Sequence, residues 1–359
     1  MLMRMIMTKL SKNKVVLGLS GGVDSTTAAL LLKERGLEVI GFYFDVSGEN
    51  EEGAGAAEDL AGRLGIKFIK ADVSSEFEQI VIKNFCEEYS CGRTPNPCVV
   101  CNPNIKFKKL IEAADREGAY YIATGHYARI SHNENTDLYY VRQGANERKD
   151  QSYMLYRLGQ DFLSRLIFPL GDFADKEKTR EMARQYNLPN ADTADSQEIC
   201  FIDDTRESYQ EYLGRRGYKS VPGEFVDCEG KVLGKHKGIM NYTVGQRKGL
   251  GIALGKPAFV TQINPETNQV TLGDNADLFH NEVYSVDNVF VDGRMLQQGE
   301  CISVKAKIRY ASKPAEAVIS AAGDGRLLTR FDEPQRAATP GQSIVFYLDD
   351  CVIGGGFID

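Results

Sequence analysis

The sequence predicts an α/β protein in which a doubly wound parallel sheet comes first, a small mixed domain follows, and an antiparallel, β-barrel-like domain ends the chain. Three observations carry this prediction. Strand-like and helical segments alternate from about residue 14 to residue 124, residues 220–273 are rich in glycine, and the remainder alternates short strand patterns with turns. At 359 residues the chain also exceeds the ~150 residues that one domain commonly takes.

The alternation in the first part of the chain predicts strands and helices in turn. Runs rich in β-branched and aromatic residues indicate strands, and apolar residues at helical spacing indicate helices. The expected strands are Lys14–Leu19, Glu38–Phe44, Lys67–Lys70 and Tyr120–Thr124, and the expected helices are Asp24–Arg35, Ala56–Leu64, Ser75–Glu88 and Ile105–Glu117. This order implies right-handed crossovers and a parallel sheet, whose ligands bind at the carboxyl ends of the strands.

The rest of the sequence predicts two further domain boundaries, near residues 205 and 275. Helical patterns continue over Gln151–Arg165 and Asp175–Tyr186, and we expect Asp175 to cap the second helix. After about residue 205 the sequence pattern changes to short apolar runs separated by turn residues. Runs such as Ser303–Tyr310 and Ser343–Leu348 predict small antiparallel sheets or a barrel. We therefore expect three domains, at residues 1–205, 206–275 and 276–359.

Composition and charge exclude several classes of protein. The formal net charge of −7 argues against a polycation of the histone kind, and no apolar run approaches the ~18 residues of a membrane span. The run Met1–Met7 is too short and too interrupted for a signal peptide. We expect a cytoplasmic protein whose eight cysteines are reduced, so that a close pair such as Cys98 and Cys101 is catalytic or metal-binding.

The strongest local motif lies between the first strand and the first helix, and it reads Gly18-Leu19-Ser20-Gly21-Gly22-Val23-Asp24-Ser25. Adjacent glycines let the backbone approach an anion, the helix N-terminus adds N–H groups and partial positive charge, and the serines add hydroxyl donors. The Gly-Lys-Ser/Thr ending of a Walker loop is missing, and Asp24 suits an ATP chemistry in which magnesium pyrophosphate leaves. A glycine-rich turn without a ligand is the alternative.

With this motif the chain resembles the PP-loop ATP pyrophosphatases, a HUP-like group that adenylates a carbonyl oxygen and releases pyrophosphate. Further motifs make it similar to the bacterial tRNA-specific 2-thiouridylases, from about residue 14 to the C-terminus. These motifs are Arg93–Asn102 with Ile105–Lys108, Ala123–Arg129, Lys149–Tyr153, Asp195–Ile202, Thr243–Ile252 and Pro340–Tyr347. The resemblance implies an enzyme that replaces the O2 oxygen of the wobble uridine in certain tRNAs with sulfur.

The chemistry of that reaction agrees with the residues present. The C2 oxygen of uracil leaves only after ATP has adenylated it, and sulfur must then arrive as a strong nucleophile, such as a persulfide or a bound sulfide. The resemblance implies that Cys200 carries the persulfide and that Cys101 is its nucleophilic partner, which leaves a disulfide bond between them. A buried structural thiol is the alternative for Cys200. For ATP, the resemblance implies contacts from Gly18–Ser25, Phe44 and Gly125.

Cys98 departs from a common form of the family, in which an aspartate with an acid–base role holds this position. With Cys101 and Cys200 it offers three thiolates, which suit a 4Fe-4S cluster that has one iron open to external sulfide. Related thiolases with the Cys-x-x-Cys form use such a cluster. Two other hypotheses stay open, namely plain thiols on the persulfide route and a zinc site with Cys86 or Cys91 as fourth ligand.

For tRNA, the resemblance implies contacts with the target base from Asn96, Pro97 and Cys98, and a proline-rich loop is suited to hold a flipped base. It implies further contacts from His126, Lys149, Asp150, Gln151, Arg309, Tyr310 and Gln342. Residues 205–256 carry ten basic and five acidic side chains, a net charge of +5, and predict a surface for RNA phosphates. A solvated charged face is the alternative for this segment, and an ordinary polar residue is the alternative for His126.

Two other functions share parts of this pattern. An ATP-dependent amidotransferase or ligase of the same superfamily would use the phosphate loop on a small molecule, with an ammonia source. An RNA-binding module would keep only a vestigial loop, and intact Asp24, Ser25, Cys101 and Cys200 argue against it. We therefore expect ATP and magnesium as cofactors, tRNA and a sulfur-donor protein or sulfide as partners, and no membrane.

Overall fold

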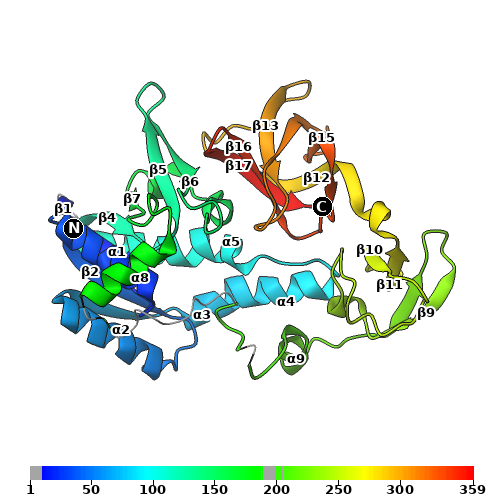
Figure 1. Cartoon of the computed structure of the whole chain (residues 1–359), viewed down its shortest axis with the longest axis horizontal. Coiled ribbons are helices and arrows are strands. Elements are labelled where there is room, and N and C mark those ends of the chain that lie inside the picture. Colours follow the sequence, from blue (N-terminus) through cyan, green and yellow to red (C-terminus); the bar gives the residue numbers. More distant parts are fainter. Residues whose placement is uncertain (1–9, 187, 189–198, 204) are drawn as a thin grey trace, which may run out of the picture. The chain divides into compact units, whose positions relative to one another are not determined.

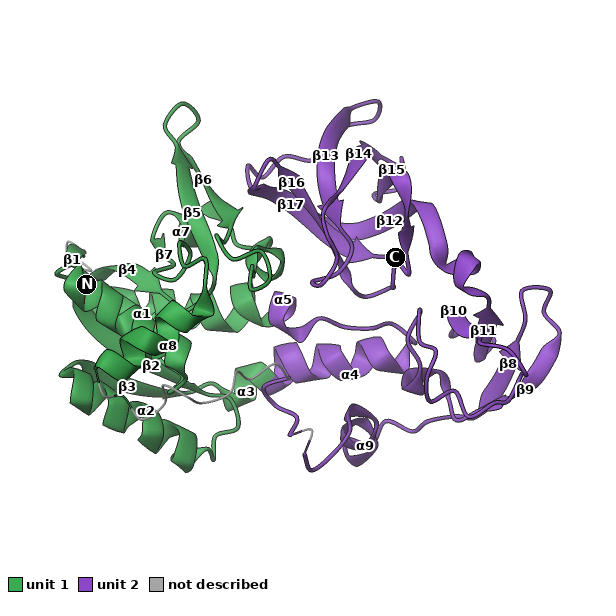
Figure 2. Cartoon of the chain, viewed as in Figure 1, with its two compact units in different colours: residues 1–77, 101–196 green, residues 78–100, 197–359 purple. Residues whose placement is uncertain are grey.

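The computed structural model describes residues 10–186, 188, 199–203 and 205–359. The chain forms two compact units, which Figure 2 distinguishes by colour. Unit 1 comprises residues 1–77 and 101–196, and unit 2 comprises residues 78–100 and 197–359.

The centre of unit 1 is a parallel sheet of five strands in the order β3-β2-β1-β4-β7 (Figure 1). Its strands are β1 (Ser11–Gly18), β2 (Glu38–Asp45), β3 (Lys67–Asp72), β4 (Ala119–Ala123) and β7 (Leu166–Ile167). The chain builds outward from β1 to β3 and then returns to the other side of β1 with β4. This confirms the predicted doubly wound parallel sheet and places its topological switch point between β1 and β4.

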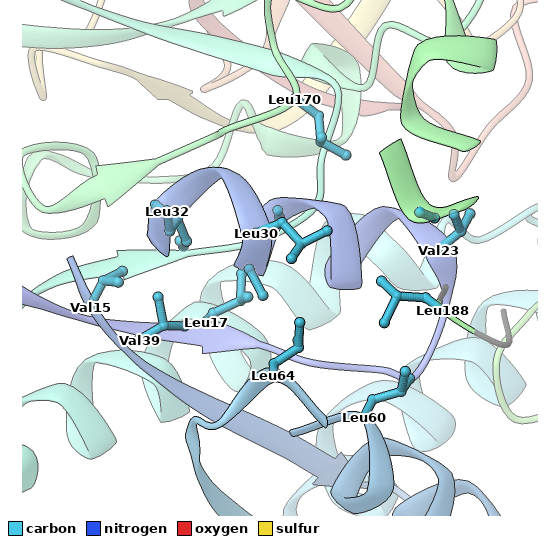
Figure 3. Close-up of a cluster of buried hydrophobic side chains, with 14 of the residues drawn as sticks. Val15, Leu17, Val23, Leu30, Leu32, Val39, Leu60, Leu64, Leu170 and Leu188 are labelled. Carbon is cyan, nitrogen blue, oxygen red and sulfur yellow. The ribbon is translucent and has the colours of Figure 1, made fainter. Parts of the chain in front are cut away.

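Helix α1 is fixed directly after β1 by the apolar core of unit 1. Figure 3 shows Leu30 and Leu32 of this helix gathered with Val15 and Leu17 of β1 and Val39 of β2, all buried. The helices of unit 1 are α1 (Val23–Glu34), α2 (Glu51–Leu64), α3 (Ser74–Phe77), α6 (Phe107–Glu117), α7 (Gln160–Leu163) and α8 (Lys176–Gln185), with a π-helix at Asn102–Lys106 and a 3-10 helix at Ser152–Leu155.

The predicted helix over Gln151–Arg165 is wrong. The segment contains the 3-10 helix and the short α7, and Gly159 stands before α7 in an extended conformation with φ −83° and ψ 175°. Glycine weakens a helix interior because it loses the most backbone freedom on ordering. The predicted cap of α8 is confirmed, since the side chain of Asp175 accepts a hydrogen bond of 2.9 Å from the backbone N–H of Glu177.

A hairpin that the sequence analysis did not predict follows β4 in unit 1. It consists of the antiparallel strands β5 (Ala128–Asn133) and β6 (Leu138–Gln143). Most of its residues are only half-buried, so the alternation of apolar and polar residues that marks a strand is weak here. The hairpin begins five residues after the end of β4 and therefore leaves from the carboxyl edge of the parallel sheet.

The helices of unit 2 are a π-helix at Glu78–Ile82, α4 (Lys83–Ser90), α5 (Pro97–Cys101, whose last residue belongs to unit 1) and α9 (Tyr209–Arg215). Aromatic side chains of α4 and α9 pack together. The ring of Phe85 in α4 meets the rings of Phe201 and Tyr212 edge-on, with centroids 5.2 and 6.3 Å away. These contacts tie the segment around Cys200 to α4 and α9.

Two β structures complete unit 2. A four-stranded sheet in the order β10-β11-β8-β9 consists of β8 (Gly223–Val226), β9 (Val232–His236), β10 (Phe259–Asn264) and β11 (Gln269–Gly273), with 3-10 helices at Ile239–Asn241 and Asn275–Leu278. A six-stranded antiparallel barrel follows and closes through the pairing of its first and last strands. Its strands are β12 (Phe279–Phe290), β13 (Cys301–Lys307), β14 (Ala315–Ala321), β15 (Leu327–Arg336), β16 (Ser343–Leu348) and β17 (Cys351–Ile358).

The barrel confirms the β-barrel-like domain that the sequence predicts at the C-terminus. Within the described part of the chain, no helix combines the length and the apolar character that crossing a membrane requires.

Candidate active site

The predicted phosphate loop connects β1 to α1 and leaves the start of the helix open. Gly21 has a φ of +82°, a left-handed conformation that glycine adopts without strain. Gly22 stands at the N-cap of α1, and no side chain caps the helix from this position. The first N–H groups of an α-helix have no partner within the helix, so this arrangement offers donors to an anion.

Two serines hold the loop in shape. The hydroxyl of Ser25 donates a hydrogen bond of 3.0 Å to the carbonyl of Gly22 and accepts one of 3.2 Å from the N–H of Ser20. The two hydroxyl oxygens lie 3.3 Å apart. The loop is therefore organised by its own hydroxyl groups, which a phosphate could engage without refolding the segment.

Residues from three strand ends meet at the carboxyl edge of the parallel sheet. A Cβ on Gly18 would lie 3.3 Å from the ring of Phe44, at the end of β2. A Cβ on Gly125, just after β4, would lie 2.9 Å from the backbone of Asp24 and Ser25. Only glycine allows the second approach, because the neighbouring atoms belong to the backbone and cannot move aside. The structure thus brings together the residues that the sequence assigns to ATP, namely Gly18–Ser25, Phe44 and Gly125.

Asp24 has two partners that the sequence analysis missed. The hydroxyl of Tyr127 donates a hydrogen bond of 2.8 Å to Oδ1, and the ammonium group of Lys176 lies 3.1 Å from Oδ2. The hydroxyl oxygen of Tyr127 also lies 3.1 Å from the hydroxyl oxygen of Thr179 in α8. The tyrosine stands inside the Ala123–Arg129 motif, whereas no local signal distinguishes Lys176 from Lys178, the other lysine of α8.

His126 lies in an aromatic environment within unit 1. Its ring stacks on Phe107 with centroids 6.0 Å apart and meets Phe168 edge-on at 5.8 Å. Nδ1 lies 2.6 Å from the hydroxyl of Thr124. Burial, assisted by the positive charge of Lys106, lowers the pKa of His126 well below its usual value. The imidazole is therefore neutral at physiological pH and can offer RNA a hydrogen bond but no charge.

The segment Lys149–Gln151 is bound tightly to unit 1. Asp150 is 4% exposed, and its carboxylate accepts hydrogen bonds from the N–H groups of Gly144 and Ser152 and from the Ser152 hydroxyl. Gln151 pairs with the backbone of Tyr127 through its own N–H and through Oε1, both at 2.9 Å. Asp150 and Gln151 thus shape the loop, and Lys149 beside them is half-buried.

The two cysteines of α5 stand three residues apart, which places them on the same face of the helix. Cys98 is exposed and Cys101 is half-buried. Asn102, which follows Cys101, is buried and donates a hydrogen bond of 2.8 Å to the carbonyl of Met154, so Cys101 is anchored within unit 1.

Cys200 is exposed in a turn of unit 2, next to the ring of Phe201 that packs on Phe85. Residues 195–198 of its motif lie outside the described residues. Burial raises the pKa of Cys86 to about 11, which disfavours the thiolate that a zinc ligand requires. Among the described residues, no three His, Cys, Asp or Glu side chains are grouped so that they could hold a metal ion.

The segment that precedes the predicted base-contacting residues is held by the barrel within unit 2. Nε2 of Gln342 donates hydrogen bonds to the carbonyls of Thr94 (2.9 Å) and Pro95 (3.2 Å). The N–H of Thr94 donates to the carbonyl of Pro340 at 2.8 Å. Gln342 therefore positions the backbone directly before Asn96, Pro97 and Cys98, a role that the sequence analysis did not predict.

Arg309 and Tyr310 follow β13 of the barrel and are half-buried. The carbonyl of Arg309 accepts hydrogen bonds from the N–H and the hydroxyl of Ser312, which shapes this turn. The ammonium group of Lys307 lies 5.8 Å from the ring centroid of Tyr310, a cation–π distance.

The ten cations of residues 205–256 divide into two sets. Ion pairs engage Arg206, Arg215, Arg216 and Lys256 with Asp203, Glu207, Glu78 and Asp274, respectively. The other six are exposed, and their side chains form no ion pair with any described residue; they are Lys219, Lys231, Lys235, Lys237, Arg247 and Lys248. A cavity of about 750 Å³ lies beside Arg247 and is lined by residues between Arg247 and Ala258. These six cations are the charges in this segment that phosphates could meet without breaking an internal pair.

Comparison with known proteins identifies relatives along nearly the full chain. Three family models match in succession: a "tRNA methyl transferase HUP domain" at residues 13–204, a "tRNA methyl transferase PRC-barrel domain" at residues 210–274 and an "Aminomethyltransferase beta-barrel domain" at residues 289–358.

Curated relatives agree with these matches. "tRNA-specific 2-thiouridylase MnmA 1" of Caldanaerobacter subterraneus subsp. tengcongensis is 47% identical over 97% of this chain and 98% of its own. "tRNA-specific 2-thiouridylase MnmA" of Syntrophomonas wolfei is 47% identical over 96% of this chain and 99% of its own. The protein of the same name in Acetivibrio thermocellus is 44% identical over 97% of this chain and 100% of its own. The chain therefore belongs to the family of tRNA-specific 2-thiouridylases.

Proposed function

We propose that this enzyme adenylates the C2 oxygen of the wobble uridine in tRNA and replaces that oxygen with sulfur, giving 2-thiouridine, AMP and pyrophosphate. The observation that carries the proposal is the meeting of the Gly18–Ser25 loop, Phe44 and Gly125 at the carboxyl edge of the parallel sheet. Membership of the 2-thiouridylase family supports the choice of acceptor. We infer a cytoplasmic enzyme.

The activation step uses unit 1. The N-terminus of α1 and the hydroxyls of Ser20 and Ser25 bind the phosphates of ATP, and the region of Phe44 and Gly125 receives the nucleoside. The uridine O2 attacks the α-phosphorus, the bond to the β-phosphate oxygen breaks, and pyrophosphate leaves. Asp24 has the carboxylate that a magnesium ion on the pyrophosphate prefers, and binding there would release it from Lys176.

The sulfur step uses the thiols. The terminal sulfur of a Cys200 persulfide attacks C2, and the C–O bond to AMP breaks. The Cys101 thiolate then attacks Sγ of Cys200, which breaks the persulfide bond, leaves the sulfur on C2 and forms a Cys101–Cys200 disulfide. An external thiol reductant restores both cysteines, and a sulfur-donor protein reloads Cys200.

A 4Fe-4S cluster is the second hypothesis for sulfur delivery. Cys98, Cys101 and Cys200 have the thiolate chemistry that holds such a cluster, and the pair Cys98 and Cys101 already shares one face of α5. When bound, the cluster would present external sulfide at its open iron. The substitution of Cys98 separates this hypothesis from the persulfide route.

Unit 2 supplies most of the RNA-binding elements, and His126 and Lys149 of unit 1 supply further tRNA contacts. We assign residues 1–205 to ATP binding and catalysis, residues 206–275 to the tRNA body and residues 276–359 to the barrel that holds the segment before the base-contacting loop. Gln342 and Pro340 fix Thr94 and Pro95 next to Asn96, Pro97 and Cys98. The six unpaired cations supply the phosphate contacts.

Two alternatives share part of this description. A ligase of the same superfamily would need a small-molecule acceptor and would leave the cysteines and the unpaired cations without a role. Methyl transfer, which two of the family-model descriptions name, needs neither a pyrophosphate-releasing loop nor a pair of thiols. Incubation with ATP and either tRNA or ammonia distinguishes them, because we expect pyrophosphate release with tRNA alone. Release with ammonia and no RNA would support the ligase.

A further inference from the structure

We propose that Gln246 and Thr243 are positioning residues that couple phosphate binding at Arg247–Lys248 to the loop that holds the target base. The proposal deepens the function given above and rests on it. It assigns a role to Thr243 and Gln246, two residues of a motif in which the proposed reaction otherwise uses only Arg247 and Lys248.

The side-chain amide of Gln246 spans the turn that carries the two cations. Its Oε1 accepts a hydrogen bond of 3.0 Å from the N–H of Thr243, and its Nε2 donates one of 3.0 Å to the carbonyl of Lys248. Both ends of the amide are therefore used. A displacement of Lys248 is passed through this side chain to the backbone of Thr243.

Thr243 in turn contacts the segment that leads to the target base. The hydroxyl of Thr94 donates a hydrogen bond of 3.2 Å to the hydroxyl of Thr243. Thr94 precedes Asn96 by two residues, and its N–H and carbonyl are bound to Pro340 and Gln342 of the barrel. The hydroxyl is the polar group of the Thr94 side chain, and it donates its hydrogen bond to Thr243.

The turn is also fixed to its surroundings, so that it moves as a body. The N–H of Gly245 donates to the carbonyl of Val260 at 2.8 Å, and the N–H of Val260 donates to the carbonyl of Gln246 at 2.9 Å. Gly245 has a φ of +90°, and a Cβ there would lie 3.0 Å from Cβ of Ala337. The two backbone hydrogen bonds to Val260 are the contacts that hold the turn against β10.

Arg247 and Lys248 are exposed, and their side chains form no ion pair with described residues, so their charges are available to a polyanion. A phosphate bound to Lys248 acts on the residue whose carbonyl Gln246 holds. Binding of the tRNA body would therefore order Thr94 and the base-contacting loop. The coupling should therefore raise kcat for bound tRNA and should leave the affinity for tRNA nearly unchanged.

The test uses the full-length enzyme and measures pyrophosphate release against tRNA concentration. Thr94→Val removes the hydroxyl at nearly constant shape, and Thr94→Ser keeps it. Gln246→Leu removes the hydrogen bonds of the side-chain amide to Thr243 and Lys248. Thr261→Val is the matched control, because the hydroxyl of Thr261 bonds to the carbonyl of Thr271 in the same sheet and has no part in the relay. Each variant is also combined with Lys248→Ala, and melting temperatures are recorded.

We expect Thr94→Val and Gln246→Leu to lower kcat about fivefold, the change that corresponds to one neutral hydrogen bond. KM for tRNA and the melting temperature should stay near wild type, as should all values for Thr94→Ser and Thr261→Val. In the Lys248→Ala background the same two substitutions should change kcat less than about twofold, because coupled sites are not additive.

An equal loss in both backgrounds, an unchanged kcat, or a Thr94→Ser variant as slow as Thr94→Val would overturn the inference. If one variant does not fold, the other end of the relay gives the same measurement. Wild-type enzyme that releases no pyrophosphate with tRNA would instead overturn the proposed function itself.

Discussion

The ammonium group of Lys176 lies 3.1 Å from the Oδ2 atom of Asp24. This ion pair joins the first turn of α1 to the first turn of α8, and its lysine is largely shielded from solvent, at 13% exposure. It keeps the carboxylate at the mouth of the phosphate loop in a defined position before ATP arrives.

The first prediction concerns this carboxylate. Asp24→Ala should abolish pyrophosphate release while leaving tRNA affinity within a fewfold of wild type, because the metal–phosphate contact is lost and the basic surface of unit 2 is not. Asp59→Ala, on the exposed face of α2, is the control and should keep full activity. Normal turnover by Asp24→Ala would remove the assignment of the phosphate loop.

The second prediction concerns RNA affinity. Each phosphate contact contributes about one unit to the slope of log affinity against log salt. Arg247→Ala and Lys248→Ala should each lower that slope by about one unit in a filter-binding titration. Lys256→Ala is the matched control, because this lysine is already paired with Asp274 and should leave the slope nearly unchanged. Equal slopes for all variants and wild type would place the RNA elsewhere.

The third prediction concerns the sulfur. Cys200→Ser and Cys101→Ser should each lose 2-thiouridine formation but keep ATP and tRNA binding, because serine preserves size and its alkoxide is inaccessible at neutral pH. Cys228→Ser, an exposed cysteine in unit 2, is the control and should stay active. Activity in either of the first two variants would contradict the thiol-pair mechanism.

The fourth prediction separates the two routes for sulfur through Cys98. On the cluster route, Cys98→Ser should lose iron and activity together in protein prepared anaerobically. On the persulfide route, Cys98→Ser should stay largely active, and Cys98→Asp should restore the aspartate form of relatives. Iron-free protein that is fully active and tolerates Cys98→Ser would eliminate the cluster.

The fifth prediction concerns stability and pH. Nδ1 of His236 accepts a hydrogen bond of 2.9 Å from the N–H of Gly238, and burial lowers the pKa of this histidine. As pH falls, His236 therefore becomes protonated in the unfolded chain before it does in the folded chain. The free energy of unfolding should decrease as pH drops through about 6.5.

Denaturant titrations at pH 7.5 and pH 5.5 test this effect. His236→Gln should destabilise the protein at pH 7.5 because the buried hydrogen bond to Gly238 changes, yet the difference from wild type should shrink at pH 5.5. A difference that grows as pH falls would contradict the neutral form of His236.

Local pattern predicted the parts of the fold that depend on neighbouring residues. The alternation up to Thr124 indicated the parallel sheet, and the strand patterns near Ser343 indicated the barrel. The helix over Gln151–Arg165 failed because one glycine breaks it, and the hairpin at residues 128–143 was missed because most of its residues are only half-buried.

The candidate site shows the same division. The Gly18–Ser25 loop is contiguous and could be read directly. Lys176 and Asp24 are separated by 152 positions in the sequence, and Gln342 and Thr94 by 248 positions. No local periodicity encodes contacts at such separations. The family resemblance implies that Gln342 contacts RNA, and the structure adds that its side-chain amide donates hydrogen bonds to the carbonyls of Thr94 and Pro95.

The most direct test of the central claim is one reaction of purified enzyme with ATP, a sulfur source and tRNA, followed by pyrophosphate measurement and mass analysis of the digested nucleosides. We predict pyrophosphate release only when tRNA is present, together with 2-thiouridine at the wobble position. Pyrophosphate release without RNA, or modified tRNA that contains no sulfur, would contradict the account.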